Sequence, residues 1–221
     1  MRERRIKILM YLPLVLAIFA LGFMDERIPM HYDFAGNVDR WGSPLEIFIL
    51  PLATLAFGYF LLGMKKIALK KEKNAGNNEK YILLTIASCL IIFNIINILI
   101  IYSGLAKLER LELNGVGFAQ IILGLTGLLH IFLGAKIPKI KRNEAIGLRT
   151  KWSDANDLVW EKSQRIAGII LILMGVLILV PIVFKIENLL VYLLTLTALC
   201  VSSMIFSSYI IYKKYGDIED K

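Results

Sequence analysis

The sequence predicts an all-α membrane protein with six transmembrane helices and both termini in the cytoplasm. Three observations support this class. First, 57% of the 221 residues are hydrophobic and the mean hydropathy is +0.65, which is more apolar surface than a soluble domain can bury. Second, six long apolar stretches alternate with polar segments. Third, lysine and arginine are distributed very unevenly between alternate loops.

Each apolar stretch is about as long as a helix must be to cross the hydrocarbon core. The first follows a basic amino terminus and lacks a small-x-small cleavage pattern, so we expect an uncleaved signal that remains as a span. Pro181 is expected to end the fifth span because proline cannot continue the helical hydrogen bonds. The predicted spans are 8–24, 45–64, 81–105, 117–135, 166–184 and 189–212.

The polar segments divide the chain into three regions. The first two spans, within residues 1–64, enclose a turn-rich loop at 25–44. A lysine-rich linker at 65–80 then leads to a four-helix region at 81–221. The longest polar segment of this last region is 136–165, which we call the signature segment.

Charge sets the expected orientation. The amino terminus, the linker, the signature segment and the carboxyl tail together hold 21 of the 26 lysines and arginines. The other three loops hold the remaining five. Because basic loops stay in the cytoplasm, the signature segment is predicted to lie inside and the 25–44 loop outside. The basic residues cluster at span ends, which indicates contacts with anionic lipid rather than direct binding of nucleic acid.

The signature segment contains residues suited to a turn followed by a helix. Asn143 and Gly147 favour turns, and glycine takes positive φ at little cost. Ser153 or Asp154 is expected to cap the helix that follows.

The same segment contains residues suited to a membrane interface. Arg149 offers a rigid fork of donors for phosphate or carboxylate. Trp152 and Trp160 suit the headgroup level, where an indole keeps one end wet. Residues alone therefore predict an interfacial loop with aromatic anchors and lipid-phosphate contacts.

The 25–44 loop permits two interpretations. His31, Asp33 and Asp39 include metal-ligand types, but zinc prefers three or four ligands that are often histidine or cysteine, and no second histidine lies nearby. We therefore predict no metal or other cofactor. The favoured interpretation is a compact lid whose aromatic residues pack on helix ends; these are Tyr32, Phe34 and Trp41.

Four polar side chains interrupt the third and fourth spans: Asn94, Asn97, Gln120 and His130. Amides are costly in hydrocarbon, so we expect them to face other helices or a wet cavity. Interhelical hydrogen bonding and the lining of a ligand or ion path both remain open. Small residues that permit close helix approach lie in the fourth span; they are Gly117, Gly124, Gly127 and Gly134.

Two motifs resemble the SdpI-like family of membrane proteins. The signature segment resembles the family pattern at Asn143, Gly147, Arg149, Thr150, Trp152, Trp160 and Gly168. The outer loop resembles the family's Pro-x-His-x-x-x-x-Gly-x-x-Asp pattern at Pro29, His31, Phe34, Gly36 and Asp39, with Trp41 close by. The chain departs from the family at Leu148, Lys151 and Gln164, where isoleucine, proline and histidine are usual.

The resemblance implies protection of the cell against a secreted membrane-active peptide, the sporulation-delay toxin. It also implies a partner on the cytoplasmic side, a transcriptional repressor recruited to the membrane. A small transporter or channel lined by the polar residues of spans three and four is the alternative. No nucleophile elbow, P-loop, dinucleotide fingerprint or HExxH motif appears, so we do not expect an enzyme.

The orientation is testable with reporter fusions. A phosphatase that works only outside the cytoplasm and a fluorescent protein that works only inside it are fused after Gly42 and after Lys151. We expect phosphatase activity at Gly42 and fluorescence at Lys151, because the positive charge lies on one side. Matching signals at both positions would contradict the arrangement.

Overall fold

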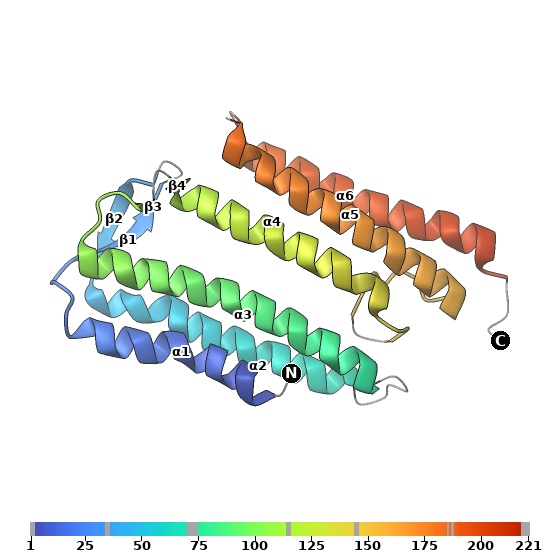
Figure 1. The fold of residues 1–221 in the computed structure, drawn as a ribbon, viewed down its shortest axis with the longest axis horizontal. Helices are drawn as coiled ribbons and strands as arrows, with labels where there is room; N and C mark the ends of the chain where they lie inside the picture. The colour runs from blue at the N-terminus through green and yellow to red at the C-terminus, as the bar shows by residue number, and fades with distance from the viewer. Residues whose placement is uncertain are drawn as a thin grey trace. The chain divides into compact units, whose positions relative to one another are not determined.

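The computed structural model describes residues 3–33, 36–69, 75–113, 116–143, 146–184, 186 and 188–217. Phe34 and the linker residues Lys70, Lys71 and Lys73 lie outside this part of the chain. Within it, helices dominate (Figure 1) and two small antiparallel sheets accompany them. The long helices are α1 (Glu3–Leu21), α2 (Ile49–Leu69), α3 (Ala75–Ala106), α4 (Phe118–Lys136), α5 (Asp157–Val183) and α6 (Leu189–Tyr215).

Among the described residues, five helical segments are long and apolar enough to cross a membrane. They are Pro44–Ile67, Asn78–Ala106, Phe118–Lys139, Asp157–Val183 and Leu189–Tyr215. α1 is not among them, because Glu3, Arg4, Arg5 and Lys7 occupy its first turns. The predicted membrane class is therefore confirmed, whereas the sixth crossing stays a prediction.

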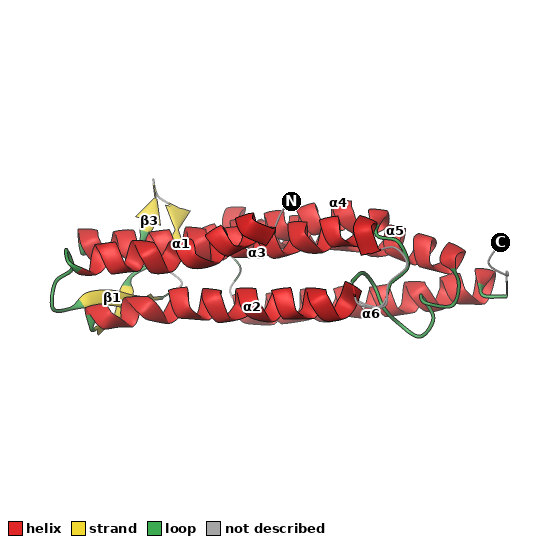
Figure 2. Ribbon diagram, turned by 90° about the horizontal axis from the view of Figure 1, so that it is seen from below, coloured by secondary structure: helices red, strands yellow, loops and turns green. Residues whose placement is uncertain are grey.

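The described chain forms two compact units. The first comprises Met1–Lys66 and Leu83–Ile122, and the second comprises Ile67–Ile82 and Leu123–Lys221. In the first unit, α1, α2 and α3 lie side by side (Figures 1 and 2). Its apolar core is formed by Ala17, Ala20, Ile28, Ile47 and Ile101.

Asn94 of α3 compensates for a proline in α1. Pro13 lies inside α1 and has no N–H, so the carbonyl of Leu9, four residues earlier, loses its helical donor. The Asn94 Nδ2 donates to that carbonyl at 2.8 Å. In hydrocarbon an unpaired carbonyl is costly, so this amide stabilises the α1–α3 contact. The expectation of interhelical bonding is thus confirmed for Asn94.

Tyr192 of α6 compensates for a second proline, Pro181, which lies in the other unit. Pro181 leaves the carbonyl of Leu177 without its helical donor near the end of α5. The Tyr192 hydroxyl of α6 donates to this carbonyl at 2.8 Å. α5 ends at Val183, as the position of Pro181 predicted.

Two glycine pairs allow α4 and α5 to approach closely. A Cβ on Gly127 would lie 2.8 Å from the carbonyl oxygen of Gly175, and a Cβ on Gly134 would lie 2.6 Å from that of Gly168. Within each helix the two glycines are seven residues apart, which places them on the same face. The predicted role of Gly127 and Gly134 as sites of close helix approach is confirmed.

The loop at 25–44 is more ordered than its turn-rich sequence indicated. Strands β1 (Ile28–Tyr32) and β2 (Val38–Gly42) form an antiparallel pair, which we call the outer hairpin. A second pair, β3 (Glu112–Leu113) and β4 (Val116–Gly117), occupies part of the predicted 106–116 loop. Backbone bonds from Val38 N to Glu109 O and from Leu111 N to Gly36 O join these segments.

One expectation about a helix end is wrong. The α5 cap is Asn156, whose side chain accepts from Val159 N, rather than Ser153 or Asp154. Both of those residues instead bond within the preceding loop. α6 continues past Lys213 and Lys214 to Tyr215. The span predicted at 45–64 lies within the segment Pro44–Ile67, where a 3₁₀-helix at Pro44–Phe48, capped by Ser43 and Glu46, precedes α2.

The Pro13–Asn94 pair predicts an interaction that a double-mutant cycle measures. Asn94→Leu should lower the free energy of unfolding in mixed micelles by about 1–2 kcal/mol, because the Leu9 carbonyl loses its donor. In a Pro13→Ala background the cost should fall, since alanine at that position supplies the missing N–H.

Asn97→Leu is the matched control for this cycle. Its Nδ2 contacts Thr54 Oγ1 of α2 rather than α1, so it should cost the same in both backgrounds. Equal costs of Asn94→Leu with and without Pro13 would contradict the assignment.

Candidate functional site

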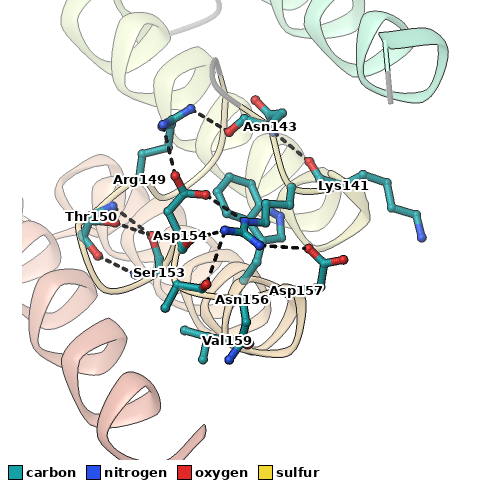
Figure 3. Close-up of polar contacts among 12 residues, drawn as sticks. Lys141, Asn143, Arg149, Thr150, Ser153, Asp154, Asn156, Asp157 and Val159 are labelled. Carbon is teal, nitrogen blue, oxygen red and sulfur yellow. Dashed lines mark hydrogen bonds and ion pairs between the residues drawn. The ribbon is translucent and has the colours of Figure 1, made fainter. Parts of the chain in front are cut away.

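The signature segment forms a closed polar loop between α4 and α5. Between a short 3₁₀ turn at Ile137–Lys139 and Asn156, which caps α5, the described residues 140–143 and 146–155 lie outside helices and strands. Several buried polar side chains hold this stretch (Figure 3). Those of Asn143, Ser153, Asn156 and Gln164 are all buried.

Gln164 of α5 holds the centre of the loop. Its Oε1 accepts from Leu148 N at 2.8 Å, and its Nε2 donates to Leu148 O at 3.0 Å. The adjacent Gly147 has φ of +99°, and a Cβ there would lie 2.6 Å from Gln164 Oε1. Both the backbone angle and the close approach therefore require glycine at this position.

Thr150 and Ser153 close a tight turn and tie it to α6. Ser153 Oγ accepts from Thr150 N at 2.8 Å, and Thr150 Oγ1 accepts from Ser153 N at 3.0 Å (Figure 3). Thr150 Oγ1 also lies 2.9 Å from Ser208 Oγ of α6. Ser208 donates its hydroxyl proton to Ile205 O. Thr150 is therefore the donor in the hydrogen bond between Thr150 and Ser208.

Two arginines are bound inside the loop. Arg149 donates to Asn143 O at 2.6 Å and lies 3.5 Å from Asp154 Oδ2 (Figure 3). Arg142 donates from Nε to Asp154 Oδ1 at 3.1 Å and lies 3.5 Å from Asp157. Arg149 was expected to donate to phosphate or carboxylate; its guanidinium contacts the Asp154 carboxylate and the Asn143 carbonyl of the loop itself.

Trp160 is part of the loop's core rather than an anchor at the headgroup level. Only 2% of its surface is exposed, and its Nε1 donates to Ile140 O at 2.9 Å. Asn143 turns the chain by accepting from Ile146 N and donating to Lys141 O. The fully buried Asn78 of α3 pairs with both backbone groups of Lys141 at 3.1 Å.

Asn156 connects both ends of the α5–α6 pair. Its Oδ1 caps α5 at Val159 N, and its Nδ2 donates to Tyr215 O at 2.9 Å, at the end of α6. One amide thus satisfies an unpaired donor of one helix and an unpaired acceptor of another. The first turn of α5 and the last turn of α6 are therefore held together.

The surface of the signature segment suits binding rather than chemistry. A cleft of about 400 Å³ is lined by residues of both charges; they are Pro138, Lys139, Ile140, Lys141, Arg142, Asp157, Trp160 and Glu161. Trp152 packs on Tyr209 of α6, with ring centroids 5.2 Å apart. Across the described ranges no group of three potential metal-ligating residues of the His, Cys, Asp or Glu type is found.

The outer hairpin presents a second polar cluster, in the first unit. His31 Nδ1 lies 2.6 Å from Asp39 Oδ1, with both side chains about half exposed or more. Asp33 accepts from Asn37 N, which closes the turn at Gly36, where φ is +85°. These contacts explain why the motif residues occur together: they shape the hairpin.

The aromatic residues of the outer hairpin behave differently from one another. Tyr32 is buried against Phe118 and donates to Leu108 O, and burial raises the pKa of its hydroxyl. The prediction that it packs on a helix end is confirmed. Trp41, however, is 43% exposed, so it does not pack as the lid interpretation required.

The remaining intramembrane residues have local partners. Gln120 accepts from Gly117 N at 2.9 Å and so caps the start of α4. His130 Nδ1 lies 2.8 Å from Thr126 O in its own helix. Asn97 contacts Thr54 of α2 at 3.3 Å and Phe93 O at 2.8 Å.

Sequence reasoning missed the residues that build the signature loop from other elements. Gln164 was noted only as a departure from the family pattern, and Asn78 was placed in a flexible linker. The available signal was a set of polar residues flanking apolar runs, which become buried when helices pack. These residues are Asn78, Arg142, Asn156, Gln164 and Ser208.

The fold and the site define an all-α, multi-pass protein of the cell membrane with a closed polar loop between two spans. The chain resembles the SdpI-like proteins: residues 139–210 match the SdpI/YfhL protein family, and residues 8–55 match a domain of unknown function, DUF1648. The chain is 26% identical over 208 residues to the immunity protein SdpI of Bacillus subtilis (strain 168), covering 94% of each chain. No solved structure matches.

The role of Gln164 can be tested by hydrogen exchange. Gln164→Leu removes the acceptor of the Leu148 N–H, while Leu148 O keeps the Ser153 hydroxyl as a donor. The unpaired N–H costs about 2 kcal/mol. The Leu148 amide should then exchange about 30-fold faster. Arg165→Gln, which removes only an exposed pair with Glu161, should leave that amide unchanged. Unchanged exchange in Gln164→Leu would contradict the assignment.

Proposed function

We propose that this protein protects its cell against a secreted membrane-active peptide toxin and signals the encounter to a cytoplasmic partner. The observation that carries the proposal is similarity to an immunity protein over 94% of both chains. Agreement over this length includes the outer hairpin and the signature segment alike. The proposed action is stoichiometric binding, not catalysis.

The outer hairpin is the proposed contact for the toxin. The charge distribution predicts that this segment faces outward. His31, Asp39 and Trp41 are exposed on it, so charge and an aromatic surface are available to an incoming peptide. Asp33 and Gly36 support this surface by forming the turn.

The signature segment is the proposed site for a partner such as a repressor. Asn143, Gly147, Arg149, Thr150 and Trp160 build the loop from within, so they would act by shaping it. Direct contacts would come from the mixed-charge cleft, which places Lys139, Lys141 and Glu161 at the surface.

α3 supplies a physical connection between the two motifs. Asn78, near its start, bonds to the backbone of Lys141 in the signature segment. Near its end, Gly104 lies against the outer hairpin, since a Cβ there would be 3.6 Å from Ile28. One continuous helix of 32 residues thus contributes a contact to each motif.

The transporter alternative receives no support from these contacts. Asn94 and Asn97 each bond to neighbouring helices, and His130 bonds within its own helix. Each of these side chains has a structural role that requires no path for a substrate.

Survival of toxin-treated sensitive cells tests the proposal. Cells expressing the unaltered protein should survive the purified sporulation-delay peptide, and Trp41→Ala should lose most of that protection, by about tenfold, because a buried aromatic contact is worth more than 1 kcal/mol. Phe23→Ala is the control, since Phe23 is 80% exposed near the end of α1 but outside the hairpin.

Membrane amounts of all variants are measured in parallel. No gain in survival with the unaltered protein present in the membrane would count against immunity. Equal loss from Trp41→Ala and Phe23→Ala would count against the hairpin as the contact.

A further inference from the structure

An apolar groove runs along α6 beside the signature segment. It has a volume of about 360 Å³ and is lined by Trp152, Ser202, Ile205, Phe206 and Tyr209. Phe206 is 63% exposed and Ile205 43% exposed. Trp152 reaches the groove from the loop, and the other four residues come from α6.

The distance from the far end of the groove to the basic end of α6 matches the thickness of one membrane leaflet. α6 is continuous from Leu189 to Tyr215, so Ser202 lies about 16 Å along the axis from Lys213 at 1.5 Å per residue. Half of the hydrocarbon core is about 15 Å thick. With Lys213 at headgroup level, the groove therefore extends over the acyl-chain region of the cytoplasmic leaflet.

Two ammonium groups lie at the headgroup end of the groove. Lys151 Nζ lies 4.9 Å from the centre of the Trp152 ring, and Lys213 Nζ lies 5.1 Å from the centre of the Tyr209 ring. The two rings are themselves in contact. Positive charge thus lies at the end where a lipid phosphate would lie, and apolar surface lies where a chain would lie.

We propose that this groove is a binding site for one anionic phospholipid of the cytoplasmic leaflet. Lys151 and Lys213 hold the phosphate, and one acyl chain lies over Trp152, Ile205 and Phe206. The charge pattern favours a lipid with net negative charge over a zwitterionic one. An apolar helix face alone would accept any chain, so the lysine pair determines the preference.

Fluorescence quenching by brominated lipid measures this preference. The full-length protein carrying Trp41→Phe is placed in phosphatidylcholine vesicles containing either brominated phosphatidylglycerol or brominated phosphatidylcholine. Trp160 is 2% exposed, so quenching reports mainly Trp152. We expect phosphatidylglycerol to associate about tenfold more strongly, and Lys151→Gln with Lys213→Gln to remove the preference.

A second lysine pair provides the matched control. Lys162 and Lys214 lie over the Tyr215 ring at 4.6 and 5.4 Å and carry the same charge at the same ends of α5 and α6. Lys162→Gln with Lys214→Gln should keep the preference.

Three results would overturn the proposal. Equal quenching by both brominated lipids, in the protein that keeps all of these lysines, would show that the groove does not select an anionic lipid. Equal loss of the phosphatidylglycerol preference in the Lys151/Lys213 variant and in the Lys162/Lys214 variant would show a general attraction of the basic surface for anionic lipid. Weak quenching by both lipids, together with a dimer that Phe206→Asp dissociates, would place a second copy in the groove.

Discussion

Everything in this structure depends on the need to satisfy backbone polar groups where water is absent. Helices meet that need along their length but fail at prolines and at their ends. Asn94 and Tyr192 supply the donors that Pro13 and Pro181 remove inside helices. Asn156 pairs the ends of α5 and α6 together. Polar side chains have a high free-energy cost in hydrocarbon when they are unpaired. Here they satisfy the backbone groups of neighbouring elements.

The same requirement explains the signature segment. A loop without regular structure between two spans has no ladder to pair its amides. Two side-chain amides take the place of such a ladder. Gln164 bonds to the N–H and the carbonyl of Leu148, and Asn78 bonds to the N–H and the carbonyl of Lys141. The described residues of the loop are therefore tied to α3 and α5 by paired hydrogen bonds.

Motif residues fall into two groups with different physical roles. Gly147, Asn143 and Trp160 form the loop from within, and Gly36 and Asp33 form the turn of the outer hairpin. Trp41, His31 and Trp152 remain at the surface. Only residues of the second group can contact a ligand directly, so the proposed recognition of a peptide or a lipid is assigned to them.

Local pattern in the sequence determined the membrane class and five of the helical spans. It also determined the end of α5 near Pro181 and the close-packing glycines of α4. These features were predictable because hydropathy and helix chemistry act over a few residues. The sequence also indicated both motifs. Only the tertiary structure decided that β1 and β2 pair, that Trp160 is buried, and that Asn94 reaches Leu9, 85 residues away. Such partners depend on how helices pack, and an amide shows the same local pattern whether it caps a loop, compensates for a proline or lines a path.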